Sequence, residues 1–97
     1  MTMPRGESNR AIITVIGRDQ IGIIAFVSGR LAEYRVNILD ISQTILKEFF
    51  TMIMVVDLEP STIELDVLAR TLEQEGTDKG LQVKVQHEDI FTFMHRI

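Results

Sequence analysis

Apolar residues recur along the chain at spacings that alternate between β and α periodicity. Residues 11–17 are rich in β-branched side chains and close on a glycine, which predicts a largely buried strand. From Gly22 to Arg35 the apolar residues Ile24, Val27 and Leu31 recur every three or four positions, which is typical of an amphipathic helix. The chain therefore begins with a predicted strand and helix.

The next segment predicts a β-hairpin. Residues 36–46 return to β character, and the consecutive apolar residues Ile38 and Leu39 interrupt their alternation, so we expect a β-bulge there. Lys47 and Glu48 can turn the chain into a second strand over residues 49–58. Because both alternating faces of this strand are largely apolar, we expect it to be central in its sheet.

A second helix and a fourth strand follow Pro60. Ser61 and Glu64 have the spacing of a capping box, and the predicted helix behind them carries a leucine stripe at 65, 68 and 72. Either Gly76 or Gly80 is expected to end this helix. Residues 81–88 alternate cleanly, which predicts a strand with one solvated face.

The last residues predict a short amphipathic helix capped by Asp89, with apolar side chains at Ile90, Phe91, Phe93, Met94 and Ile97. The order β-α-β-β-α-β predicts a ferredoxin-like α+β sandwich, in which a four-stranded antiparallel sheet carries both main helices on one face. Met52, Met54 and Val56, or their neighbours in the other phase, then lie on the open face and need a cover. Phe91 with Phe93, or a second chain, are the candidates.

Length and composition limit what the chain can be. Its 97 residues and 45% apolar content support one core without a disulfide or a metal. The chain has no cysteine, which excludes thiolate catalysis and zinc–thiolate sites. We expect residues 1–9, which are polar, to be a disordered segment and residues 10–97 to form a single domain.

Charge and hydropathy exclude two classes of partner. The net charge is −4 and the ten Lys and Arg residues do not cluster, so direct nucleic-acid binding is not expected. The longest apolar run, Met52 to Val56, is far shorter than the ~20 residues that span a bilayer. No membrane association is expected, and cytoplasmic localisation is the default.

Catalysis is not expected either. His87 and His95 have no serine or cysteine nucleophile motif around them, and His87 is predicted on the inward face of its strand as a core or rim histidine. The acidic residues are scattered over different elements, so we expect no metal site, no cofactor and no catalytic residue.

The candidate chemistry lies between the first strand and the first helix. The first turn of a helix presents unpaired N–H groups and a partial positive charge, which suit a carboxylate, and Gly22 lets a ligand approach the backbone. Asp19 supplies a negative charge and Asn37 an amide, and we expect the two to come together. This set of groups matches a free α-amino acid.

Each of these residues also has a structural interpretation. Asp19 can cap the first helix, and Asn37 can be a turn residue in the left-handed region. Gly22 can serve the loop conformation alone. Gly29, inside the first helix, costs roughly 1 kcal/mol relative to alanine and is interpreted as allowing close packing.

Residues 17–23 (GRDQIGI) followed by residues 36–41 (VNILDI) resemble the ACT-domain signature, and residues 41–44 and 49–52 are similar to the small ACT proteins of the UPF0237 group. The resemblance covers about residues 10–97. It implies a regulatory, non-catalytic side-by-side dimer that binds an amino acid between the first loop of one chain and the start of the second strand of the other. The site residues that it implies are Asp19, Gln20, Ile21, Gly22, Ile23, Asn37 and Ile38.

The resemblance also implies how such a protein acts. A related protein, the glycine cleavage system transcriptional repressor, works through a protein partner, so a regulatory partner protein is expected beside the homodimer formed through residues 36–46. The alternative is a structural dimerisation or protein-interaction module with the same fold and no ligand. Thermal-shift measurements with amino acids distinguish the two.

Overall fold

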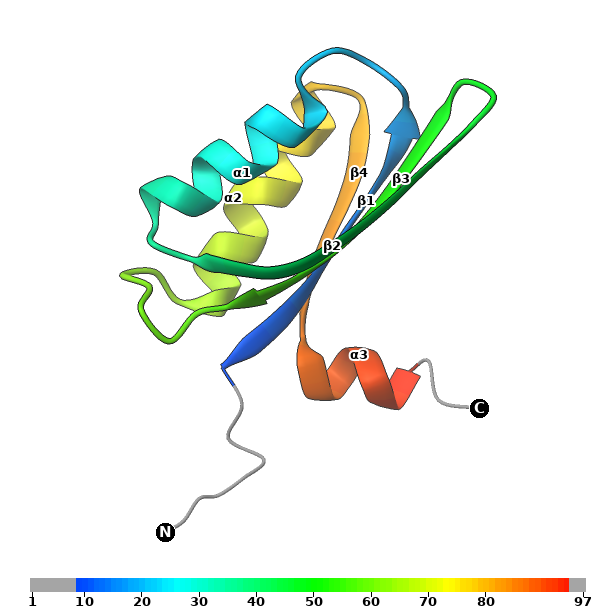
Figure 1. Cartoon of the computed structure of the whole chain (residues 1–97). Helices are drawn as coiled ribbons and strands as arrows, with labels where there is room; N and C mark the ends of the chain where they lie inside the picture. Colours follow the sequence, from blue (N-terminus) through cyan, green and yellow to red (C-terminus); the bar gives the residue numbers. More distant parts are fainter. Residues whose placement is uncertain (1–8, 95–97) are drawn as a thin grey trace, which may run out of the picture.

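The computed structural model describes residues 9–94, with side chains to residue 91. Its elements are β1 (Arg10–Arg18), α1 (Ile23–Glu33), β2 (Asn37–Leu46), β3 (Phe49–Asp57), α2 (Leu65–Asp78), β4 (Leu81–His87) and α3 (Glu88–Met94) (Figure 1). This confirms the predicted βαββαβ order with a C-terminal helix. Residues 1–8 of the predicted disordered segment, together with His95 and Ile97, lie outside the described residues.

The four strands form one antiparallel sheet in the order β2-β3-β1-β4, and α1 and α2 cover one face of it (Figure 1). The prediction that β3 is central is therefore confirmed. Its pairing with β1 aligns Val15 with Met52 and Ile13 with Met54, and all four of these side chains are fully buried. The core lies between these two strands and the leucine and valine stripes of the helices.

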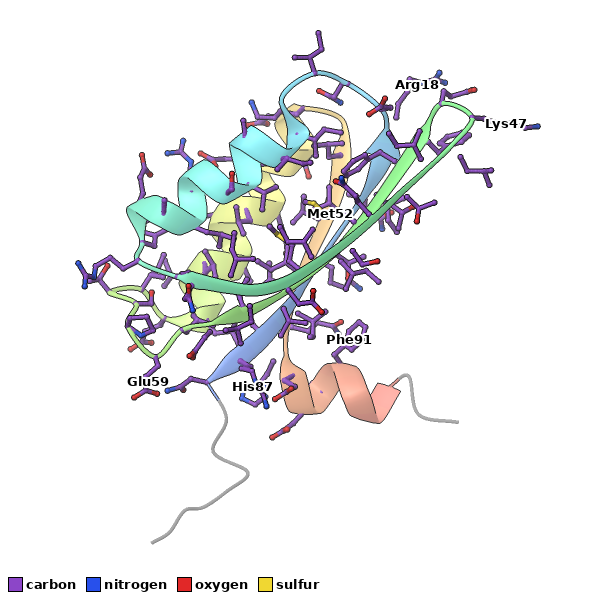
Figure 2. All side chains as sticks on the ribbon, viewed as in Figure 1. Arg18, Lys47, Met52, Glu59, His87 and Phe91 are labelled. Atoms are coloured by element: carbon purple, nitrogen blue, oxygen red, sulfur yellow. The ribbon has the colours of Figure 1, made fainter. Side chains whose placement is uncertain are left out.

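The phase of β3 settles which residues face solvent. Met52, Met54 and Val56 point toward the helices and are fully buried, so the other phase lies on the open face, where Ile53 is 39% exposed. Figure 1 shows α3 on this side of the sheet, where it contacts β1 and β4, and Figure 2 shows Phe91 pointing from α3 toward the strands. The C-terminal helix therefore covers part of the open face; the side chain of Phe93 lies outside the described ones.

The predicted capping box is wrong. α2 begins at Leu65 with Glu64 as its N-cap, and the described residues provide no side-chain cap there. Ser61 instead donates its hydroxyl to the Tyr34 carbonyl at 2.8 Å and accepts the Ile63 N–H at 3.0 Å. Its side chain joins the end of α1 to the segment before α2, where it adds to the hydrogen bond that the Tyr34 carbonyl accepts from the Thr62 N–H at 3.2 Å.

The helix glycines behave in opposite ways. α2 continues through Gly76 and ends before Gly80, which has a φ of 76°. Gly76 is buried, and a Cβ at that position would run into Cγ2 of Val83 on β4. A Cβ on Gly29, by contrast, would meet nothing within 4 Å, so the close-packing interpretation of Gly29 is wrong within one chain.

The two edges of the sheet differ. On β2 the predicted bulge is confirmed between Ile38 and Asp40, and residues 39–46 are all exposed. On β4 the edge is engaged, because the backbone N–H of Val85 donates to the Glu73 carboxylate of α2 at 3.3 Å. A free N–H on a strand edge is a pairing site for another strand, so β2 is the edge left more open to association.

Hydrogen-bonded side chains join α1 to α2 and cap α3. The Arg30 guanidinium of α1 donates two hydrogen bonds of 2.7 Å to the Glu75 carboxylate of α2, and these bonds, followed by the one to Glu33, raise the pKa of Arg30 above its usual range. At the other end of the molecule α3 begins at Glu88, so Asp89 lies inside its first turn and is not the predicted cap. The N–H of Asp89 donates to Nδ1 of His87 at 3.0 Å, which makes His87 a half-buried rim residue that caps α3.

Candidate functional site

The β1–α1 loop forms one wall of a surface groove of about 530 Å³. The loop is held in place because the N–H of Asp19 donates to the Glu48 carbonyl in the β2–β3 turn at 2.7 Å. The groove is lined by Asp19, Gln20, Gly22, Ile23, Ile24, Ala25, Gln43, Thr44, Ile45 and Phe50. Its walls thus come from the loop, the first turn of α1 and the far half of the β2–β3 hairpin.

Gly22 is the N-cap of α1 and has a φ of 91°, so the loop conformation itself requires glycine. The Phe26 N–H closes the first helical turn on the Gly22 carbonyl at 2.8 Å, which leaves the N–H groups of residues 23–25 without intrahelical partners. Within the described first turn there is no acidic side chain and no side-chain cap. The interpretation of Asp19 as the helix cap is therefore wrong.

The other loop residues take different positions. The Gln20 amide donates to the Lys79 carbonyl at 3.2 Å and, more weakly, to the Arg18 carbonyl at 3.5 Å, so it anchors the loop to the end of α2. Ile21 is fully exposed outside the groove, whereas Ile23 is only 4% exposed and belongs to the core. The structure thus brings Asp19, Gln20, Gly22 and Ile23 of the predicted set to one groove.

The hairpin wall was missed by sequence reasoning. Ile45 is paired with Phe50 and Gln43 with Met52, so their side chains share the face of the sheet that carries the helices. The alternation of β2 was the available signal, because it placed Ile41 and Ile45 on one face. What the sequence did not show was that this face runs directly beneath the start of α1.

Asn37 lies far from Asp19 within the chain. Asn37 is paired with Asp57, which is paired with Arg10 at the start of β1, whereas Asp19 follows Arg18 at the end of that strand. Eight residues of strand separate the two ends, or about 27 Å at ~3.4 Å per residue. The expectation that the two residues meet is therefore wrong for a single chain.

The structural interpretation of Asn37 is also wrong. Asn37 and Ile38 lie inside β2, and the left-handed position that precedes the strand is occupied by Arg35, with a φ of 61°. Asn37 is exposed, while Ile38 is half-buried and paired with the fully buried Val56 on the helix side. The Asn37 amide is thus not used for a turn.

The groove is sparsely charged. Among the described residues that line it, Asp19 is the only ionisable one, and it is exposed. The neighbouring Arg18 points to the hairpin, where its guanidinium lies 3.5 Å from the Glu48 carboxylate and above the Phe49 ring. The groove therefore combines one carboxylate, free helix amides and apolar walls.

Two further observations concern residues 9–94. No three or more His, Cys, Asp or Glu side chains there are grouped so that they could hold a metal ion. None of the helices in that part of the chain is long and apolar enough to cross a membrane.

The fold and the groove now define a class. A family model described as ACT domain matches residues 9–86, so the chain is an ACT domain, a small-ligand regulatory module. It is 52% identical over 88 residues to a UPF0237 protein of Clostridium acetobutylicum, covering 91% of this chain and 99% of that protein. The chain belongs to the UPF0237 family of ACT domain proteins.

Solved structures agree with this assignment. An ACT domain protein from Streptococcus pneumoniae superposes with a TM-score of 0.75 at 41% identity, covering 88% of this chain and 96% of that one. A putative glycine cleavage system transcriptional repressor superposes with a TM-score of 0.69 at 23% identity, covering 82% of this chain and 46% of that one. The second similarity shows a shared fold.

Proposed function

We propose that this protein is a non-catalytic regulatory homodimer that binds an amino acid between its two chains and signals to a partner protein. One observation carries the proposal: Asp19 and Asn37 lie at opposite ends of β1 and β2 within a chain. Antiparallel pairing of β2 with the β2 of a second copy reverses those ends. Asn37 of the second chain then comes to the end of β2 that borders the Asp19 groove.

The properties of β2 support this mode of pairing. Its residues 39–46 are all exposed, while Glu73 occupies one N–H of the β4 edge. Ile41, which is 41% exposed on the helix side of β2 and lies outside the groove, would be covered by the second copy. Removing such apolar area from water favours association.

The groups around the groove suit both ends of an α-amino acid. The Asp19 carboxylate can accept hydrogen bonds from an ammonium group, and the free N–H groups at the start of α1 can donate to a carboxylate. Asn37 of the second chain adds an amide that both donates and accepts. A ligand held in this way bridges two chains.

Bridging is what makes ligand binding a signal. A ligand that contacts both chains stabilises one relative arrangement of the subunits over others, and a partner protein that prefers that arrangement responds to the ligand. We assign no catalytic residue, metal or cofactor to this function. The Gln20 amide joins the loop to the end of α2, so a movement of the groove wall on ligand binding would be passed directly to α2.

A thermal-shift panel with the twenty amino acids is the first test. At least one amino acid should raise the melting temperature with increasing concentration, and Asp19→Ala and Asn37→Ala should each remove the rise. No shift with any amino acid would instead favour the dimerisation module without a ligand.

Mixing the two variants tests the shared site. Neither homodimer of Asp19→Ala or of Asn37→Ala contains an intact site, but their heterodimer contains one site with both wild-type residues. Random exchange between equal amounts should restore about a quarter of all sites, measured by calorimetric titration. A site built within one chain would recover no binding in the mixture.

A further inference from the structure

The groove has two apolar walls, one on α1 and one on β2. Ile24 on α1 is 40% exposed and Ile45 on β2 is 56% exposed, and both border the same hollow. Ile23 and Phe50 form its floor and are each 4% exposed. The groove is thus lined by two partly exposed aliphatic side chains from different elements and by two buried core side chains.

The charges around the groove exclude several ligand classes. Asp19 is the only ionisable residue in the described lining. Of the neighbouring cations, Arg18 faces Glu48 and the Lys79 ammonium lies 5.1 Å from the centre of the Phe26 ring. A second carboxylate on the ligand would face Asp19 with no lining cation, and a second ammonium would compete with the first for one carboxylate.

The polar groups leave the apolar walls to the ligand's side chain. Asp19 and the start of α1 form the loop end of the groove, where the ammonium and carboxylate groups would be bound. Ile24 and Ile45 then flank the remaining volume, together with the Gln43 amide on β2. A volume of about 530 Å³ lies within the ~300–1,000 Å³ usual for small-molecule sites, so space remains beyond the backbone atoms of an amino acid.

We infer that the groove selects amino acids with an uncharged aliphatic side chain, which is packed between Ile24 and Ile45. This inference rests on the proposed function and specifies its ligand class. Burial of the aliphatic group removes apolar surface from water on both partners, so affinity should grow with the length of the side chain.

The test is a homologous series titrated by calorimetry into the full-length wild-type protein: alanine, 2-aminobutyrate, norvaline and norleucine. Each added methylene should raise the affinity about fourfold until the groove is filled. Serine, aspartate and lysine should bind more weakly than norvaline, because each brings a polar or charged group to the apolar walls.

Two variants link the selectivity to the walls. Ile45→Thr and Ile24→Thr each replace an exposed aliphatic wall with a polar one, and each should weaken norleucine binding about tenfold while changing alanine binding little. Val67→Thr is the matched control, since Val67 is 38% exposed on α2 and lies outside the groove. Sedimentation of each variant checks that the dimer persists.

The outcomes are distinct. Affinity that rises along the series, and flattens in both wall variants but not in the control, supports the inference. If serine, aspartate or lysine binds best and Asp19→Ala still abolishes binding, the ligand class is overturned while the proposed function stands. If no amino acid binds a protein that sediments as a dimer, both are overturned.

Discussion

Gly76 offers a direct test of how tightly α2 is packed on the sheet. Replacing it with alanine should gain ~1 kcal/mol of helix propensity. The added Cβ would run into Cγ2 of Val83, with Cβ of Val83 at 3.2 Å and the Leu81 carbonyl oxygen at 3.3 Å. Val83 is 7% exposed and β-branched, so it has little freedom to rotate away.

The two effects oppose each other, and the clash should be larger. Overpacking of a core costs ~1–3 kcal/mol, and the close approach to a stiff neighbour favours the upper end of that range. The net expectation for Gly76→Ala is a loss of about 2 kcal/mol, or a melting temperature lower by roughly 8–16 °C for a domain of this size.

Gly29→Ala is the matched control. A Cβ at Gly29 meets nothing within 4 Å, so only the helix propensity changes, and the variant should be about 1 kcal/mol more stable than wild type. Urea denaturation followed by circular dichroism measures both free energies of unfolding. A Gly76→Ala protein as stable as wild type would refute the inference of close packing between α2 and β4.

Three further predictions concern association and local contacts. Ile41→Lys places a charge near the centre of β2 and, in the proposed dimer, close to the same charge on the second chain. Sedimentation should therefore show a monomer at tens of micromolar, whereas Val67→Lys on α2 should remain dimeric. Ser61→Ala should lower the free energy of unfolding by ~1 kcal/mol, because the Ile63 N–H loses its acceptor and the Tyr34 carbonyl keeps only the Thr62 N–H, at 3.2 Å. Glu64→Ala should leave the free energy of unfolding unchanged, whereas a loss as large as that of Ser61→Ala would show that the two residues do form a capping box. Gln20→Ala should speed hydrogen exchange in the β1–α1 loop while the exchange of β1 itself stays slow, since the bonds from the Gln20 amide to the Lys79 and Arg18 carbonyls are lost and the pairing of β1 with its neighbours is not changed.

Most of the fold could be predicted because periodicity reports burial directly. Both faces of β3 are apolar, which fits a strand between two others and beneath the helices. The spacing of buried residues along a helix also distinguishes the buried Gly76 from the exposed Gly29. Gly76 continues the stripe of Leu68 and Leu72 at four-residue spacing, whereas Gly29 falls midway between the buried residues Val27 and Leu31.

The site was harder to predict because motif spacing does not report direction. β1 and β2 run parallel, as both pair antiparallel with β3, and α1 returns the chain to the starting end of the sheet. The loop after the first strand and the start of the second strand therefore lie at opposite ends in any such βαβ unit. Tertiary contacts could not be predicted either. The spacing of Ser61 and Glu64 matched a helix start, yet the Ser61 hydroxyl donates to the backbone carbonyl of Tyr34.

The hydrogen bond from the Val85 N–H to Glu73 has a consequence for the size of any assembly. A sheet with two free edges can add copies at both ends and grow into a fibre, because every addition exposes a new edge. Here a carboxylate from α2 occupies one N–H of the β4 edge, so joining at β2 leaves two β4 edges, each with that N–H occupied, at the ends of the extended sheet. Growth of the sheet beyond two copies is thereby disfavoured.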